Sequence, residues 1–287
     1  MSSVSITWEV IGGPRPLDYR CSMIATPRPV GDLLREWRQR RRVSQLDLAL
    51  EAEISPKHVS FIESGRAQPS REMILRLAEH LDVPLRERNA LLHAGGFAPM
   101  FAERSLDDPA LASARAAVDL VLKAHEPFPA LAVDRHWSLM AANSAVGFLL
   151  EGVDPSLLAP PTNVLRVSLH PKGLGPRIAN FVEWRAHVLD RLRRQVDVTN
   201  DGVLMDLLHE LREYPVPVDA DATPHPRSDY AGVVIPFKLR LAGGVLAFFG
   251  TTTVFGTPVD ITLSELAVEA FFPADEATAH ALRRMVS

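Results

Sequence analysis

Cysteine and long apolar runs are the scarcest features of this 287-residue chain. The single cysteine, Cys21, excludes a disulfide framework and a cysteine-based zinc site. No run of roughly eighteen apolar residues occurs, and no signal peptide is recognisable, so we expect a cytoplasmic protein without membrane insertion. The hydrophobic fraction of 47% is still ample for folded cores, and the length predicts two domains.

Recognisable catalytic motifs are missing as well. The chain contains no HExxH, GxSxG or P-loop sequence. Its histidines are scattered without the spacing of metal ligands, and the glycine-bearing residues 170–175 lack the strand-to-helix context of a phosphate-binding loop. We therefore expect a protein that is not an enzyme and that holds neither a metal nor a cofactor.

Residues 43–69 carry the most informative pattern in the chain. Ser44 can cap one short helix, and Ser55 followed by Pro56 can start a second, because serine caps and proline at the first helical position are typical of helix starts. The apolar residues of the first helix fall three and four apart on one expected face: Leu46, Ala49 and Leu50. Two short helices joined by a tight turn predict a helix-turn-helix, whose second helix enters the DNA major groove.

The second of these helices has a side to bury and a side to present to DNA. Val59 and Ile62 form the buried side, and Gly65 lies just past the helix end, as a left-handed cap does. The remaining side chains can reach phosphates or base edges. The predicted DNA contacts are Arg42, Gln45, Ser55, Lys57, His58, Ser60, Phe61 and Arg66. Lys57 is the first candidate for reading a guanine.

One position departs from the usual motif. The turn between the two helices usually contains glycine, whereas this chain has Glu53. A non-glycine residue in the left-handed conformation costs about 1–2 kcal/mol, so we expect a strained or differently bent turn. An ordinary helical hairpin is the alternative for this stretch. The two serine caps, the small Ala49 and the glycine after the second helix together favour the helix-turn-helix.

Three further helices complete a five-helix domain. The first covers residues 30–42, the second runs from the Ser70 cap to a stop at Pro84, and the third covers residues 85–93. The first of them ends in a run of arginines at positions 38, 40, 41 and 42. Such a run suits contact with phosphates. It equally suits the negative end of the helix dipole, so the sequence leaves both interpretations open.

The net charge of −4 hides an asymmetry along the chain. Residues 28–97 hold 12 basic and 10 acidic side chains, whereas residues 98–287 hold 17 basic and 23 acidic ones. A weakly basic helical domain is therefore followed by an acidic one, which suits a regulator whose second half does not touch DNA. So small a basic excess predicts weak binding by one monomer, and hence binding as a dimer.

Prolines and chain-breaking segments divide the chain into four predicted parts. These are a flexible tail at 1–28, the DNA-binding domain at 29–98, a connector with a helix at 99–126, and a second domain at 127–287. The connector helix, residues 111–125, carries an apolar stripe. The stripe could pack on the second domain or pair with a partner chain, and the sequence leaves both possibilities open.

The pattern of the second domain predicts an antiparallel sheet with covering helices, which makes the whole chain α+β. The expected strands cover residues 130–133, 137–141, 233–241, 245–255 and 261–272. The expected helices cover residues 144–150 with an Asn143 cap, 177–196, 204–211, and a last one from the Asp275 cap to Met285. Residues 261–272 are ambiguous, because Thr262 and Glu265 could box a helix, but alternation favours a strand.

Three segments are similar to a known family. Residues 70–99, SREMILRLAEHLDVPLRERNALLHAGGFAP, resemble the stretch that follows the motif in Xre-type regulators with an MmyB-like ligand-binding domain. Residues 124–146, AHEPFPALAVDRHWSLMAANSAV, and 246–278, LAFFGTTTVFGTPVDITLSELAVEAFFPADEAT, are similar to two hallmark segments of that domain. The resemblance covers about residues 30–287. It implies a PAS-like second domain that holds an apolar small molecule, fatty-acid-like in some members.

Aromatic residues of the second domain are candidates for lining such a pocket beneath the helices that cover the sheet. They are Trp137, Phe148, Phe181, Trp184, Phe237, Phe248 and Phe271. Arg185 and His187 could meet a carboxylate at the mouth of the pocket. Each aromatic side chain could equally belong to an ordinary core, and both polar residues could simply be exposed.

The sequence therefore predicts a transcriptional regulator that binds a specific sequence of double-stranded DNA as a homodimer. Its second domain is expected to bind a small apolar effector, fatty-acid-like in character, that modulates DNA binding. The alternative is a ligand-independent DNA-binding protein, in which the second domain serves dimerisation or binds another protein.

Overall fold

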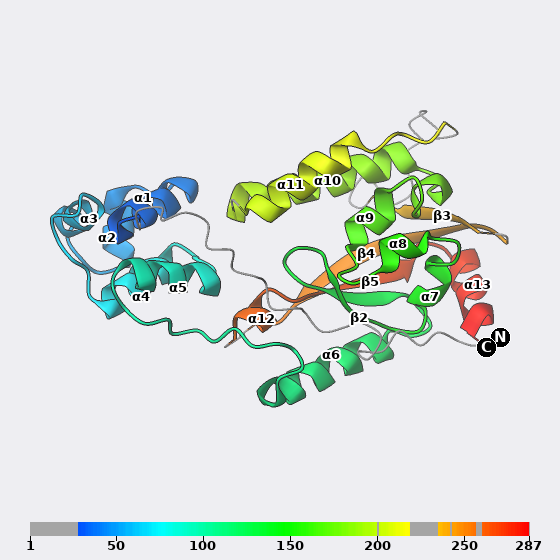
Figure 1. The fold of residues 1–287 in the computed structure, drawn as a ribbon, viewed down its shortest axis with the longest axis horizontal. Helices are drawn as coiled ribbons and strands as arrows, with labels where there is room; N and C mark the ends of the chain where they lie inside the picture. The colour runs from blue at the N-terminus through cyan, green and yellow to red at the C-terminus, as the bar shows by residue number, and fades with distance from the viewer. Residues whose placement is uncertain (1–27, 200, 219–234, 242, 257–259, 287) are drawn as a thin grey trace. The chain divides into compact units, whose positions relative to one another are not determined.

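The computed structural model describes residues 28–286 apart from residues 200, 219–234, 242 and 257–259, so the predicted tail lies almost wholly outside the described residues. The chain divides into two compact units. In their described parts, the helical unit comprises residues 28–104 and 260–264, and the sheet unit comprises residues 105–256 and 265–286. Both units can be followed along the chain in Figure 1.

The helical unit contains the five expected helices. They are α1 (Val30–Arg40), α2 (Gln45–Glu51), α3 (Pro56–Glu63), α4 (Arg71–His80) and α5 (Leu85–Ala94). The hydroxyls of Ser44, Ser55 and Ser70 each accept a hydrogen bond from the backbone N–H three residues on. These three serines are therefore helix caps, as the sequence predicts.

The first helix of the motif presents a different face from the one expected. Leu46 and Leu50 are 56% and 69% exposed, whereas Leu48 and Ala52 are buried beside Ala49. Both pairs, 46 with 50 and 48 with 52, have the spacing of one helical face. Because α2 packs on α3, the tertiary contact selects the second pair. Of the expected apolar face of Leu46, Ala49 and Leu50, only Ala49 is buried.

The sheet unit has a five-stranded antiparallel sheet in the order β2-β1-β5-β4-β3. Its strands are β1 (Ala130–Val133), β2 (Leu139–Ala142), β3 (Phe237–Leu241), β4 (Gly244–Val254) and β5 (Ala267–Pro273). Its helices are α6 (Ala112–Ala124), α7 (Val146–Leu149), α8 (Pro155–Leu158), α9 (Val164–Leu169), α10 (Phe181–Thr199), α11 (Gly202–Glu213) and α13 (Glu276–Val286), with short 3-10 turns at Pro109–Leu111 and Gly175–Arg177. This is the α+β fold that the sequence predicts.

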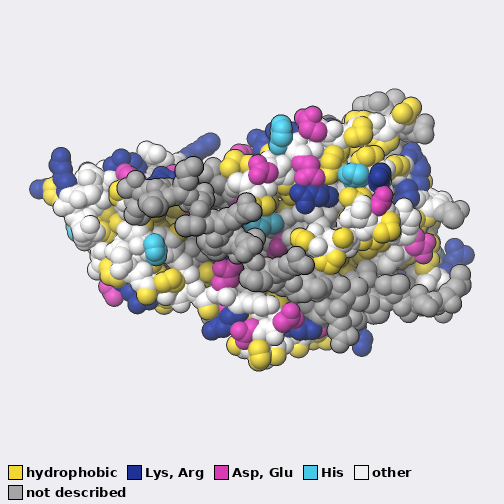
Figure 2. All heavy atoms as spheres, viewed as in Figure 1, with side chains coloured by type: hydrophobic (Ala, Val, Ile, Leu, Met, Phe, Trp, Pro, Cys, Tyr) yellow, Lys and Arg dark blue, Asp and Glu magenta, His cyan; other side chains and the backbone are white. Residues whose placement is uncertain are grey.

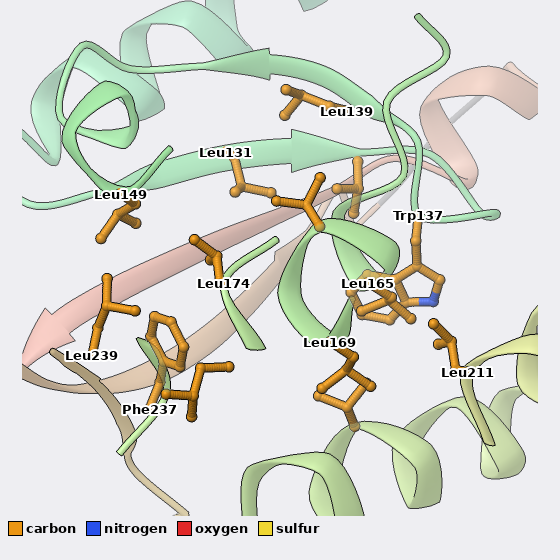
Figure 3. Close-up of a cluster of buried hydrophobic side chains, with 14 of the residues drawn as sticks. Leu131, Trp137, Leu139, Leu149, Leu165, Leu169, Leu174, Leu211, Phe237 and Leu239 are labelled. Carbon is orange, nitrogen blue, oxygen red and sulfur yellow. The ribbon is translucent and has the colours of Figure 1, made fainter. Parts of the chain in front are cut away.

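The two faces of this sheet have different neighbours. Side chains from β1 to β4 join those of α7, α9, α10 and α11 in one buried apolar cluster (Figure 3). On the opposite face, the ring of His125, just after α6, meets the ring of Phe272 at a centroid distance of 4.6 Å. Within the α6 stripe, Val118 and Leu122 are buried, but Val121 is 42% exposed; Leu120, outside the stripe, is 69% exposed.

Three local predictions for residues after the five helices need correction. Asn143 does not cap a helix; its side chain accepts from the Ala130 N–H and donates to the carbonyls of Leu122 and Phe128. Residues 261–272 are not one strand, because a helical turn, α12 (Ile261–Ser264), precedes β5. The long helix begins at Phe181 rather than residue 177. Among the described residues, no helix is both long and apolar enough to cross a bilayer.

Candidate DNA-binding surface and ligand cavity

The outer side of α3 gathers cations on an aromatic ring. Lys57 is exposed, and its Nζ lies 5.5 Å from the centroid of the Phe61 ring. The guanidinium of Arg66, just past the helix end, lies 5.8 Å from the same centroid. Figure 2 shows Lys and Arg side chains around the end of the helical unit where α3 lies. Cations at these distances are attracted to the ring face, so the α3 surface presents ordered positive charge.

An ion-pair network holds α3 against the two helices before it. Glu63, the last residue of α3, is only 3% exposed. Its carboxylate accepts bonds from Arg38 on α1, at 2.6 and 2.9 Å, and from the Gln45 amide on α2, at 2.8 Å. Burial raises the pKa of the Glu63 carboxyl, but hydrogen bonds from Arg38 and Gln45 outweigh it, so the pKa lies below its usual value. The network therefore holds α3, the recognition helix, in a fixed position against α1 and α2.

The run of arginines at the end of α1 is used mostly inside the protein. Besides the Arg38 pair, Arg40 pairs with Glu36, and Arg41 donates to the carbonyls of Leu81 and Asp82 at 2.9 and 2.7 Å. Arg42 is exposed, with a positive φ of 57°. The first three arginines therefore stabilise the fold through ion pairs and hydrogen bonds, and Arg42 remains a candidate for DNA.

Four of the eight predicted DNA contacts lie on α3, and Ser55 and Arg66 flank its two ends. Lys57 and Arg66 are exposed, while His58, Ser60 and Phe61 are half-buried. Ser55 is exposed but accepts the His58 N–H as the cap of α3. Gln45 uses one amide hydrogen on Glu63, so within the described structure it has a structural role that the sequence did not reveal.

The turn between α2 and α3 has the unusual geometry expected of it. Glu53 has a φ of 54°, in the left-handed region. Gly65, after α3, has a φ of 72°, as predicted for the cap. Because only glycine adopts this region without steric cost, Glu53 carries strain that Gly65 does not.

Replacing Glu53 with glycine should stabilise the helical unit. Relief of the left-handed strain favours the variant by about 1–2 kcal/mol, and the greater backbone freedom of glycine in the unfolded chain offsets part of this. We expect a net gain of about 1 kcal/mol in the free energy of unfolding, measured by denaturant titration. The exposed Glu51→Gly, inside α2, is the matched control and should destabilise; a loss in both variants would contradict the strain argument.

The sheet unit contains a cavity of about 490 Å³ between the sheet and its covering helices. Most of its wall is aliphatic or aromatic, and Figure 3 shows the buried side chains that converge around this region from the strands and helices. The apolar lining residues are Leu131, Trp137, Leu139, Val146, Leu149, Leu150, Val164, Leu165, Val167, Leu174, Trp184, Val188, Ile235, Phe237 and Phe271. A concave, mostly apolar site with a few polar groups is typical of small-molecule pockets.

The charged groups of the cavity centre on one ion pair. Arg191 of α10 contacts both carboxylate oxygens of Glu269 on β5, at 2.6 and 3.0 Å, and Thr252 of β4 at 2.7 Å. The guanidinium lies 4.6 Å from the centroid of the Trp137 ring. The Trp137 indole in turn donates to Gln195 at 2.9 Å. Arg191 is thus fixed in position where it lines the cavity.

Two more groups on α10 complete this end of the cavity. Burial lowers the pKa of His187, and the nearby charges of Arg191 and Arg194 lower it further, so the imidazole is neutral at pH 7. Arg194 pairs with Asp190 at 3.0 Å and is largely exposed. The lining therefore holds two arginines, each paired with one carboxylate: Arg191 with Glu269 in the lining, and Arg194 with Asp190 outside it.

Five of the nine predicted ligand contacts line the cavity: Trp137, Trp184, His187, Phe237 and Phe271. Phe181 and Phe248 are fully buried in the surrounding core, and Phe148 packs beside that core. Arg185 points elsewhere, donating to the carbonyl of Arg212 at the end of α11. These four were wrong as lining residues.

Sequence reasoning missed the charged residues of the cavity. Arg191 and Glu269 are 78 residues apart, and no local pattern joins them. An available signal was the spacing of His187, Arg191 and Arg194, which fall three and four apart on one side of the long helix. A single acidic residue, Glu269, inside an otherwise apolar strand was a second signal.

Comparison with known proteins agrees with this division of roles. Residues 29–91 match a family described as a helix-turn-helix domain. Residues 114–285, more than half of the chain, match the MmyB-like transcription regulator ligand binding domain. No match to a curated protein was found. With a recognition helix in one unit and an apolar cavity in the other, the chain belongs to the MmyB-like transcription regulator family and is a DNA-binding regulator with a ligand-binding domain.

Proposed function

We propose that this protein is an Xre-type, homodimeric regulator whose affinity for its operator changes when an apolar molecule with an acidic head, such as a fatty acid, binds the cavity. The observation that carries the proposal is the composition of the cavity. Long apolar walls suit an acyl chain, and the guanidinium groups of Arg191 and Arg194 are donors that suit its carboxylate. The role of the protein is binding and regulation rather than catalysis.

The hydrogen-bond donors at the polar end support an anionic head group more specifically. Glu269 neutralises one arginine, and His187 carries no charge at pH 7 because its pKa is lowered by burial. Thr162 and Ser168 add hydroxyl groups to the lining. A ligand carboxylate could compete for the N–H groups of Arg191 and Arg194, each of which is paired with one carboxylate.

For DNA binding, we propose that α3 enters the major groove and that two copies of the chain read two half-sites about 34–36 Å apart. The cations on Phe61 are suitably placed on the outer side of α3. The exposed Leu120 and Val121 on α6 support association with a second copy. Sedimentation of the purified chain with and without DNA measures this step.

The decisive experiment combines ligand identification with DNA binding. Small molecules extracted from the purified protein are identified by mass spectrometry, and an operator is selected from a random DNA pool. The affinity for that operator is then measured with and without C8–C18 fatty acids. Absence of a co-purified molecule, together with no thermal shift from these acids, would favour the ligand-independent interaction module.

Filling the cavity from its sheet side should reduce ligand affinity. A side chain at Gly250 would extend into the cavity, and a Cβ built there meets only Phe271 Cε1, at 3.9 Å. We expect Gly250→Ile to weaken fatty-acid binding at least about tenfold, about 1.4 kcal/mol, in a calorimetric titration. Thr251→Ile, at the neighbouring exposed position, should bind like the original protein; equal losses in both would show an effect on the strand rather than on the cavity.

A further inference from the structure

Part of the connection between β4 and β5 belongs to the helical unit rather than to the sheet unit. These strands pair along their length, from Phe248 with Pro273 to Val254 with Ala267. Hairpin loops are commonly two to five residues long, yet here residues 255–266 intervene. Residues 260–264, which include α12, belong to the helical unit and pack on α5.

The backbone of this segment is bonded to the residues that follow α5. Asp260 forms a parallel bridge with Ala102, and the Ile261 N–H donates to the Ala102 carbonyl at 2.9 Å. The Thr262 hydroxyl donates to the carbonyl of Arg104 at 2.6 Å. Ile261 is 2% exposed. The segment is therefore packed and hydrogen-bonded in the helical unit rather than only tethered to it.

A buried carboxylate lies at the centre of these contacts. Asp260 is 0% exposed, and its Oδ2 accepts a bond from Arg104 Nη1 at 3.0 Å. Its Oδ1 accepts the Thr262 N–H at 2.9 Å, which caps α12. A buried charge is stable only while it is paired and hydrogen-bonded, so Asp260 makes this docked arrangement sensitive to the loss of either partner.

The partner segment is itself fixed to α5. The Asn89 amide donates to the Phe101 carbonyl at 2.7 Å, and its oxygen accepts the N–H groups of Met100 and Phe101 at 2.9 and 3.1 Å. Arg86 pairs with Glu103. We call residues 100–104 with residues 260–264 the Asp260 clasp. It joins the connection between two strands to a helix of the helix-turn-helix domain.

The same two strands carry part of the cavity wall. Gly250 and Thr252 on β4 face Phe271 and Glu269 on β5 across the ladder, and Thr252 and Glu269 both bond Arg191. We infer that the Asp260 clasp is the regulatory link: a ligand that shifts β4 or β5 changes how the clasp docks, and so changes the affinity for DNA. This inference rests on the proposed function, since it requires ligand-dependent DNA binding.

The ligand can act in this way only if it binds the docked and released states with different affinities. Such coupling typically changes the affinity for the second ligand by a factor of about 5–150, and by the same factor in both directions. Removing the clasp should therefore abolish the coupling and leave each binding site intact. Loss of coupling with both binding sites intact would show that the clasp links the two sites, whereas a purely structural role would also weaken binding at one of them.

The test uses the full chain, the selected operator and tetradecanoate as the probe. For the original protein, we expect operator Kd values with and without tetradecanoate to differ by about 5–150-fold. In Asp260→Asn and in Thr262→Val, which removes only the hydroxyl bond, we expect this ratio to fall towards one. The tetradecanoate Kd of each DNA-free variant should stay within a few-fold of the original. Arg115→Gln, which breaks the exposed pair with Asp107, is the matched control and should keep the full ratio.

The outcomes distinguish the two ideas. A ratio near one in the original protein would overturn the proposed regulation and this inference with it. A normal ratio in the original protein that persists in both clasp variants would overturn the inference alone. Loss of the ratio in the Arg115 control as well would also overturn it, because the coupling would then not depend on the clasp. Hydrogen exchange at Ile261 and Thr262 gives an independent readout: tetradecanoate should change it in the original protein.

Discussion

Replacing Arg38 with methionine is expected to destabilise the helical unit by about 3–5 kcal/mol, the largest effect of any single change proposed here. The guanidinium is the main partner of Glu63, whose side chain is only 2% exposed. Without it, the carboxylate stays buried with the Gln45 amide and the more distant Arg35. Native-state hydrogen exchange of α1 and α3 amides measures this unit separately from the rest of the chain.

A double variant provides the control. Arg38→Met with Glu63→Met removes both charges and replaces them with apolar side chains, which is often nearly neutral for stability. We expect most of the loss in the single variant to be recovered. If the double variant is as unstable as Arg38→Met alone, packing of the arginine rather than its charge is responsible.

The same pair predicts the response of the helical unit to acid. The folded-state pKa of Glu63 lies below its usual value, so the ionised carboxylate favours the folded state. Its contribution is fully present above the ordinary Glu pKa of about 4.3 and is lost as the pH falls through the lower, folded-state pKa. In the double variant this part of the acid destabilisation should be absent.

Replacing Lys57 with alanine is expected to weaken operator binding by about 1–3 kcal/mol at each half-site if the lysine reads a base. The side chain is exposed near the start of α3, the end of a recognition helix that contacts base edges. Fluorescence anisotropy with the selected operator and with random DNA measures the loss of binding free energy on each DNA. A dimer would show the loss at both half-sites.

Lys123→Ala is the matched control, because Lys123 is an exposed lysine on α6 of the sheet unit. It should leave operator affinity unchanged. A loss for Lys57→Ala that is equal on operator and random DNA would identify a phosphate contact. The slope of log affinity against log salt concentration should then decrease in magnitude by about one. No loss on either DNA would exclude Lys57 from the interface.

Local chemistry made the helical unit predictable. Serine caps, Gly65 after α3 and the left-handed Glu53 all follow from properties of one or a few neighbouring residues. The face of α2 could not be predicted, because two apolar pairs had equal spacing and packing on α3 decided between them. The prediction of one strand over residues 261–272 was wrong for a related reason. The segment is divided between the two units, and no local sequence pattern marks that division.

The cavity was predictable in kind but not in detail. Aromatic residues mark the apolar interior, yet Phe181 and Phe248 fill the core while Trp184 and Phe271 border empty space. The difference lies in which neighbours leave a gap, and this depends on the assembled helices. The Arg191–Glu269 pair depends on the register of β5 against β4 and on the position of α10, all of which are long-range.

The stacking of Lys57 and Arg66 on one ring has a consequence for the thermodynamics of DNA recognition. A free lysine or arginine side chain loses about 1.5–2 kcal/mol of rotamer entropy when it is immobilised. Because Phe61 already restricts both side chains, part of that loss occurs during folding rather than at the groove. If Lys57 and Arg66 contact DNA as proposed, Phe61 should contribute to affinity by lowering the entropic cost of association, even where its ring touches no base.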